Sequence, residues 1–264
     1  MKRNPVMLAL LMILAFLFNC CAPEVQEKTI PVTTDSETAL ELYTKAIDAA
    51  NKVYVAKAMK LFEEALTEDP AFFQAAFRLA IFNFYFEETD GFEKYANKAI
   101  NMEADLSKGE ELMRSMLVAL LEDPEADVSD IGKEIIELYP EDDQAYFPLS
   151  FYYMIQNDDE NLVQIHKTLL EITDNPAPIY NLLGYSYMDL GRMEEAEDAF
   201  DTYIELEPGI PNPYDSKGDY YMKAEDYEKA YEFYMKAYEI DTLWSYKKAM
   251  KAQKMLEEAE GLAQ

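Results

Sequence analysis

Residues 177–208 read APIYNLLGYSYMDLGRMEEAEDAFDTYIELEP, and this stretch decides the fold. Its apolar residues recur at the spacing of two amphipathic helices, which a short polar turn at residues 190–192 joins. Small residues such as Gly184 lie where the two helices must approach closely. Pro208 follows the second helix, and proline cannot continue a helix. The stretch therefore predicts a helical hairpin.

The same pattern returns 34 residues later. Gly184 and Tyr187 of the first unit recur as Gly218 and Tyr221 of the next. A period of this length and chemistry is typical of a helical solenoid. Weaker units precede these two and start near Asp143, Gly109, Phe73 and Ala39. The sequence therefore predicts six units in an all-α chain.

The unit resembles the tetratricopeptide repeat, and the following residues carry the resemblance: Tyr180, Leu183, Gly184, Tyr187, Ala196, Phe200 and Pro208. The next unit departs from the family pattern, with Lys217 where leucine is usual and Thr242 where proline is usual. The resemblance covers about residues 39–244. It implies a right-handed superhelical solenoid over residues 37–244, a capping helix within residues 245–264, and a role in binding other proteins.

The beginning of the chain predicts export. Lys2 and Arg3 precede an unbroken apolar run of thirteen residues, 6–18, which is too short to span a bilayer but typical of a signal peptide. Residues 17–20, Leu-Phe-Asn-Cys, resemble a bacterial lipoprotein processing box, which implies a signal peptide over residues 1–19 and lipidation of Cys20. Cys21 is the alternative acceptor. An ordinary secretory signal with incidental cysteines is the other interpretation.

The cysteine count agrees with lipidation, because both cysteines of the chain are Cys20 and Cys21. Lipoproteins of this class carry more than one acyl chain, palmitate among them, and two chains are enough for stable anchoring. The residue after Cys20 is not Asp, which favours the outer over the inner membrane of a Gram-negative envelope. Residues 20–36 contain two prolines and no helical period, so we expect a lipidated N-terminus and a flexible tether ending at a helix cap, Asp35 or Ser36.

Charge and composition exclude several functions. The chain has a net charge of −29, and removal of residues 1–19 leaves 21 basic against 52 acidic residues, a net charge of −31. Such a surface repels nucleic acid. The single histidine, His166, lies where the next unit has Phe200 and is expected to be packed in the core. With no other histidine and no cysteine beyond Cys21, the usual zinc and iron ligand sets cannot form, so we expect no enzyme, metal or cofactor.

In such solenoids the first helix of each unit lines the concave side. The inward-facing positions of this helix can be read from one unit to the next. They give a candidate partner-binding groove of Tyr43, Phe77, Ile81, Phe84, Met113, Phe147, Phe151, Met154, Asn181, Tyr185 and Met188. An apolar and aromatic groove suits an amphipathic helix or an extended apolar segment. Two other interpretations stay open: in a strongly curved solenoid these side chains are core, or they form a self-association surface.

The sequence therefore favours a lipid-anchored scaffold that binds a protein or peptide partner at a membrane surface. The alternative is an outer-membrane lipoprotein that captures a solute such as a glycan. That function requires paired aromatic side chains with polar groups beside them, a mix that the groove residues lack. A row of lysines in the last helix, Lys247, Lys248, Lys251 and Lys254, is interpreted as the polar face of the capping helix or a docking place for an acidic partner.

Overall fold

The computed structural model describes residues 28–261. This part of the chain contains thirteen α-helices and one short 3-10 helix, and it contains no strand. The predicted signal peptide, both cysteines and residues 22–27 of the predicted tether lie outside the described residues. The all-α prediction is confirmed.

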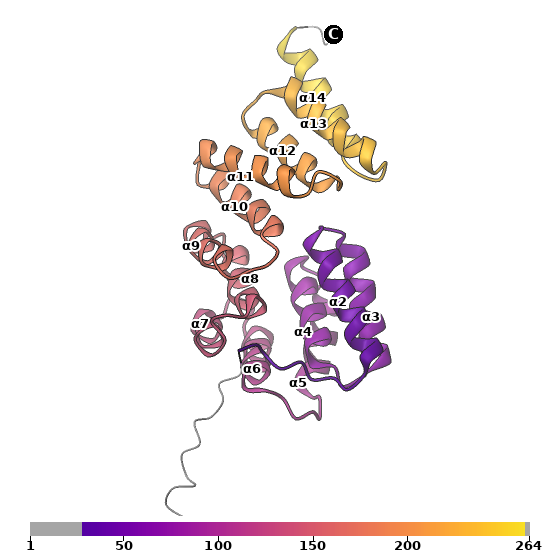
Figure 1. The fold of residues 1–264 in the computed structure, drawn as a ribbon, viewed down its shortest axis with the longest axis vertical. Coiled ribbons are helices and arrows are strands. Elements are labelled where there is room, and N and C mark those ends of the chain that lie inside the picture. The colour runs from indigo at the N-terminus through magenta and orange to yellow at the C-terminus, as the bar shows by residue number, and fades with distance from the viewer. Residues whose placement is uncertain (1–27, 262–264) are drawn as a thin grey trace, which may run out of the picture.

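The helices form six consecutive hairpins and a final single helix (Figure 1). The hairpins are α2 (Glu37–Asn51) with α3 (Val55–Glu68), α4 (Phe73–Tyr85) with α5 (Thr89–Ile100), α6 (Lys108–Glu122) with α7 (Ser129–Leu138), α8 (Phe147–Ile155) with α9 (Asp159–Leu170), α10 (Ala177–Asp189) with α11 (Met193–Leu206), and α12 (Asn212–Lys223) with α13 (Tyr227–Ile240). The 3-10 helix η1 (Asp143–Tyr146) precedes α8, and α14 (Tyr246–Ala259) packs on α13. Six units and a terminal helix match the helical-repeat solenoid expected from the sequence.

Local signals in the sequence start these helices. The Ser36 hydroxyl accepts a hydrogen bond from the Ala39 amide at 3.2 Å, so Ser36 caps α2 as one of the two predicted residues. Ser107 and Glu110 form a capping box at the start of α6, in which each side chain bonds to the other residue's backbone amide. Prolines fit in the first turns of α10 and α12, because the amides of a first turn have no partner within the helix.

Within the last two hairpins, the helices approach most closely at the predicted glycines. A Cβ atom on Gly184 would lie 2.5 Å from the Phe200 ring, and one on Gly218 would lie 2.5 Å from the Tyr234 ring. The same contact therefore recurs one repeat apart. Only a residue without a side chain lets the aromatic ring of the second helix lie on the backbone of the first.

The superhelix brings its two ends together. Tyr54, in the turn between α2 and α3, meets Trp244, in the turn before α14, with ring centroids 5.8 Å apart in an edge-to-face arrangement. Figure 1 shows the first hairpin beside that turn. The curvature is thus strong enough for residues 190 positions apart to touch across the solenoid.

Candidate functional site

Most of the predicted groove residues are buried. Seven of the eleven are 8 % exposed or less: Tyr43, Phe77, Ile81, Met113, Phe151, Asn181 and Met188. The other four are half-buried: Phe84, Phe147, Met154 and Tyr185. Phe77 and Ile81 are at most 1 % exposed, so a partner cannot reach them in this conformation. The seven buried side chains are packed in the solenoid, as the core interpretation expects, and the partner-binding groove remains a prediction.

The reason is direct packing of α4 against the start of the fourth unit. The Arg78 guanidinium carbon lies 3.6 Å from the centroid of the Phe147 ring, and Arg78 donates a hydrogen bond to the Gln144 side chain at 2.6 Å. The rings of Tyr85 and Phe151 lie 5.7 Å apart. Helices two units apart thus touch across the inner side, and their aromatic side chains fill it.

The residues before α2 differ from the prediction of a flexible tether. Residues 28–35, here called the strap, lie extended across the N-terminal ends of α6, η1 and α4 before the chain enters α2 (Figure 1). Ile30 is only 5 % exposed. The tether prediction is therefore wrong for the strap and remains a prediction for residues 20–27.

Side chains of three units bind the backbone of the strap. The Ile30 amide donates to Asp142 Oδ2 at 2.7 Å, and the Thr33 amide donates to Glu110 Oε1 at 3.2 Å. Gln74 Nε2 donates to the Pro31 carbonyl at 3.2 Å. We call Gln74, Glu110 and Asp142 the rim residues, because each lies at or beside the first turn of a unit's first helix.

The rim residues are themselves buried. Glu110 is fully buried, and Gln74 and Asp142 are each 7 % exposed. Burial raises the pKa of Asp142, and the amide hydrogen bonds from Ile30 and Gln144 partly offset this effect. Sequence reasoning missed all three. The Ser-x-x-Glu spacing at residues 107–110 is typical of a capping box and could have been recognised, but nothing local indicates that Glu110 also holds the strap.

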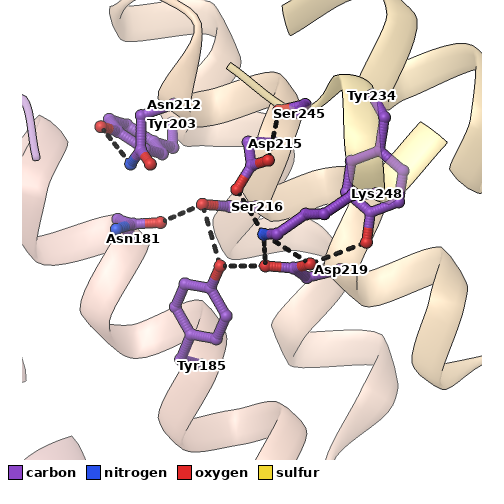
Figure 2. A network of polar contacts seen from close by, with 10 residues as sticks. All are labelled: Asn181, Tyr185, Tyr203, Asn212, Asp215, Ser216, Asp219, Tyr234, Ser245 and Lys248. Carbon is purple, nitrogen blue, oxygen red and sulfur yellow. Dashed lines mark hydrogen bonds and ion pairs between the residues drawn. The ribbon is translucent and has the colours of Figure 1, made fainter. Parts of the chain in front are cut away.

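A second polar cluster joins the last two hairpins to α14 (Figure 2). Lys248 of α14 contacts Asp215 Oδ2 at 2.7 Å and Asp219 Oδ2 at 2.8 Å on α12. Two of the predicted groove residues belong to this cluster: Tyr185 donates to Asp219 Oδ2 at 2.8 Å, and Asn181 accepts from the Ser216 hydroxyl at 2.8 Å. The cluster thus ties α10, α12 and α14 together.

The electrostatics of this cluster follow from burial and the two carboxylates. Burial by itself would lower the pKa of Lys248, but Asp215 and Asp219 outweigh it and the pKa is raised. Burial and then Asp219 raise the pKa of Tyr185, and the same two causes raise that of Tyr234. Lys248 therefore pairs with two acidic residues of this chain at a partly exposed position, whereas the sequence left its row as the polar face of the capping helix or a docking place for an acidic partner.

Two unusual residues also find structural roles. Lys217, which replaces a leucine, is 1 % exposed, and its amine lies 2.8 Å from Asp201 and 3.3 Å from Glu197 on α11. His166 is 2 % exposed, and burial lowers its pKa to about 4. The prediction of a packed histidine is confirmed.

Residues 28–261 contain no group of three or more metal-ligating side chains placed to hold an ion. No helix in that range is long and apolar enough to cross a bilayer. A polar hollow of about 580 Å³ opens between the start of α7, the end of α8 and the start of α9. Tyr152 and Tyr153, with ring centroids 5.7 Å apart, line it together with amide side chains such as those of Asn157 and Asn161.

Comparison with known proteins identifies the repeats. Residues 177–210 and 212–242 each match the tetratricopeptide repeat model. No curated protein sequence matches the chain significantly. The crystal structure of TTC0263, described as a thermophilic TPR protein of Thermus thermophilus, is similar with a TM-score of 0.50 and 17 % identity; the match covers 83 % of this chain and 98 % of that one.

A crystal structure of MamA protein is similar at 17 % identity, with a TM-score of 0.41 and coverage of 78 % of this chain and 93 % of that one. At such identities the TTC0263 likeness concerns the fold alone, and the MamA likeness is too distant to carry an argument. The chain therefore contains two adjacent tetratricopeptide repeats at residues 177–210 and 212–242, within a longer all-α solenoid of helical hairpins.

Proposed function

We propose that the protein is a lipid-anchored, non-enzymatic scaffold of a Gram-negative cell envelope that binds a protein or peptide partner, with the outer membrane as its site. The apolar run of residues 6–18 and the following cysteines support export and lipidation at Cys20, or at Cys21. Tetratricopeptide repeats generally serve as scaffolds, and one histidine with no cysteine beyond Cys21 leaves little for catalysis.

One observation carries the binding proposal. The rim residues hold an extended segment by bonding to its backbone, from three successive units. Backbone recognition by a row of polar side chains is a general way to bind an extended polypeptide. The half-buried Phe147 begins α8 directly after η1, five residues from Asp142, and the half-buried Phe84 lies at the opposite end of α4 from Gln74.

Photo-crosslinking in cells tests partner binding. A benzoyl-phenylalanine at Phe147 replaces one half-buried aromatic ring by another, and the same group at Leu243, which is 91 % exposed, serves as the matched control. We expect a protein adduct from position 147 that position 243 does not give, identified by mass spectrometry. Adducts of equal yield from both positions, or none from position 147, would refute partner binding beside the rim residues.

Fatty-acid labelling tests the anchor separately. An alkyne fatty acid should label the wild-type protein, and Cys20→Ser should abolish labelling if Cys20 is the acceptor. Cys21→Ser should abolish it in the alternative case. Label retained in both single variants and in the double variant would show that the cysteines are not lipidated.

The polar hollow favours a second candidate function, the capture of a solute such as a glycan. Tyr152 and Tyr153 supply a pair of aromatic rings, and Asn157, Asn161 and Gln156 supply amide groups beside them. The predicted groove residues lack this combination of paired aromatic rings and adjacent polar groups. Screening the protein on an oligosaccharide array, with Asn161→Ala as the comparison, tests it. Oligosaccharide binding that is weaker in the Asn161→Ala variant would support glycan capture. No binding by the wild-type protein would reject this function.

A further inference from the structure

The strap is bound the way a peptide ligand is bound. Three of its backbone groups, the Ile30 and Thr33 amides and the Pro31 carbonyl, are paired with side chains of the solenoid rather than with each other. The strap has one internal backbone hydrogen bond, from the Thr34 amide to the Val32 carbonyl at 3.0 Å, and none of the three groups above takes part in it. Another extended segment that offers these three groups at the same spacing can therefore take its place.

The rim residues depend on such a segment. Glu110 is fully buried; it accepts from the amide and hydroxyl of Ser107 at 3.0 Å, from Gln74 Nε2 at 3.4 Å, and from the amide of Thr33 at 3.2 Å. A buried polar group that loses its partner destabilises the protein by about 1–3 kcal/mol. An extended chain, or water admitted in its place, therefore stabilises the rim by pairing the oxygens of Glu110 and Asp142 that the strap now pairs.

Side chains of the strap set the specificity. Ile30 enters a niche beside Gly109 and Tyr139, where a Cβ atom on Gly109 would lie 3.2 Å from Ile30 Cγ2. The Thr33 hydroxyl donates to Glu110, and the Thr34 hydroxyl donates to Asp69 Oδ2 at 2.6 Å. The rim residues and Asp69 thus recognise a β-branched apolar residue at position 30 and hydroxyl side chains at positions 33 and 34, whereas Pro31 is recognised through its backbone carbonyl.

The strap is also held weakly at its N-terminal residue, Lys28. Lys28 pairs with Glu141 at 2.8 Å, but the two side chains are 79 % and 65 % exposed, and exposed pairs of this kind contribute little. Beyond this pair, residues 30–34 carry the attachment. Release can therefore begin at Lys28 and proceed toward α2 without unfolding a helix.

We propose that the strap is a cis-bound ligand of the rim, and that the rim exchanges it for an extended segment of the same pattern on a partner protein. The proposal rests on the proposed function in that it names the site and the chemistry of the partner segment. The strap then lowers the apparent affinity for partners, because a tethered segment competes at an effective concentration in the millimolar range. Only a segment that binds more tightly, or a strap that has been pulled away, opens the site.

Peptide binding to the full chain in detergent tests this exchange. The probe is a fluorescein-labelled peptide of residues 28–36, KTIPVTTDS, followed by fluorescence anisotropy. Ile30→Asp in the protein places a charge in the apolar niche and should release the strap, whereas Thr29→Ala, at an exposed strap position, should leave it bound. We expect the Ile30→Asp protein to bind the probe at least about tenfold more tightly than wild type and Thr29→Ala. A probe that itself carries Ile30→Asp should bind none of them.

Two results would overturn the exchange: no saturable binding to a folded Ile30→Asp protein, or equal binding to all three proteins. A second measurement needs no substitution. Excess unlabelled peptide should accelerate hydrogen exchange at the Ile30 and Thr33 amides of the wild-type protein and leave α12 unchanged. Unchanged exchange at both amides would also overturn the proposal. A partner adduct from position 147 whose yield is the same in wild type and Ile30→Asp would leave the scaffold function standing and reject the strap as its competitor.

Discussion

His166 should make the folded protein less stable in mild acid. Its side chain is 2 % exposed, and its Nδ1 has no hydrogen-bond partner within the described range of residues 28–261. Burial lowers its pKa from 6.5 to about 4. The pKa of His166 is lower in the folded than in the unfolded state. The contribution of its neutral form to the free energy of unfolding is therefore complete above pH 6.5 and is lost as the pH falls toward 4.

The size of the effect follows from the two pKa values. At pH 5 the unfolded chain binds a proton at His166 that the folded chain excludes, which lowers the free energy of unfolding by about 2 kcal/mol relative to pH 7.5. Below pH 4 the loss approaches about 3 kcal/mol. His166 is the only histidine of the chain, so the effect can be assigned to one residue.

The perturbation is His166→Phe, because Phe200 occupies the equivalent position one repeat later. Urea unfolding followed by circular dichroism at pH 7.5 and pH 5.0 gives the free energies; both values lie above the pI of about 4.2. At pH 7.5 we expect the free energies of unfolding of the two proteins to differ by no more than about 1 kcal/mol. At pH 5.0 the difference, variant minus wild type, should be about 2 kcal/mol larger than at pH 7.5. Acidic residues titrate equally in both chains and cancel in this difference.

A difference between the two proteins that is the same at both pH values would refute the reasoning. It would mean that His166 takes up its proton in the folded state, so that burial does not hold it neutral. Any loss of stability between pH 7.5 and pH 5.0 that wild type and variant have in common would be assigned to the carboxyl groups, which both proteins share.

Two further predictions concern the C-terminal repeats. Lys248→Met removes the ion pairs of this lysine with Asp215 and Asp219 and leaves the hydrogen bond from Ser245 to Asp215. Since the lysine side chain is 45 % exposed, we expect a screened loss of only about 1 kcal/mol and a red shift of Trp244 fluorescence as α14 loosens. An unchanged spectrum would show that these ion pairs do not hold α14 in place. Gly184→Ala would place a methyl group 2.5 Å from the Phe200 ring and should lower the free energy of unfolding by about 1–3 kcal/mol in a urea titration. Gly209→Ala, which meets no atom within 4 Å, is the matched control and should change it by less than about 0.5 kcal/mol.

Short-range signals in the sequence were enough to predict the repeating hairpins. These signals are apolar spacing within each helix, Gly184 opposite Phe200 within one hairpin, and a cap such as Ser36 at a helix start. Each signal depends on residues close together in the chain. The local structure that it predicts is therefore the same however strongly the superhelix curves. The same locality explains why His166 was correctly placed in the core from its register with Phe200.

The accessibility of the inner residues and the position of the strap depend instead on how distant units pack. The sequence left open whether Phe151 lines a groove or belongs to the core, because its exposure depends on how far the units rotate relative to one another. In the structure Tyr85 of a distant unit packs against it. A flexible tether and a docked extended segment have the same composition and lack the same helical period. What separates them here is the contact of Ile30 with Asp142, 112 residues away. Such a contact exists only after the curvature of several units has brought their first turns into one row, and no short-range pattern encodes that curvature.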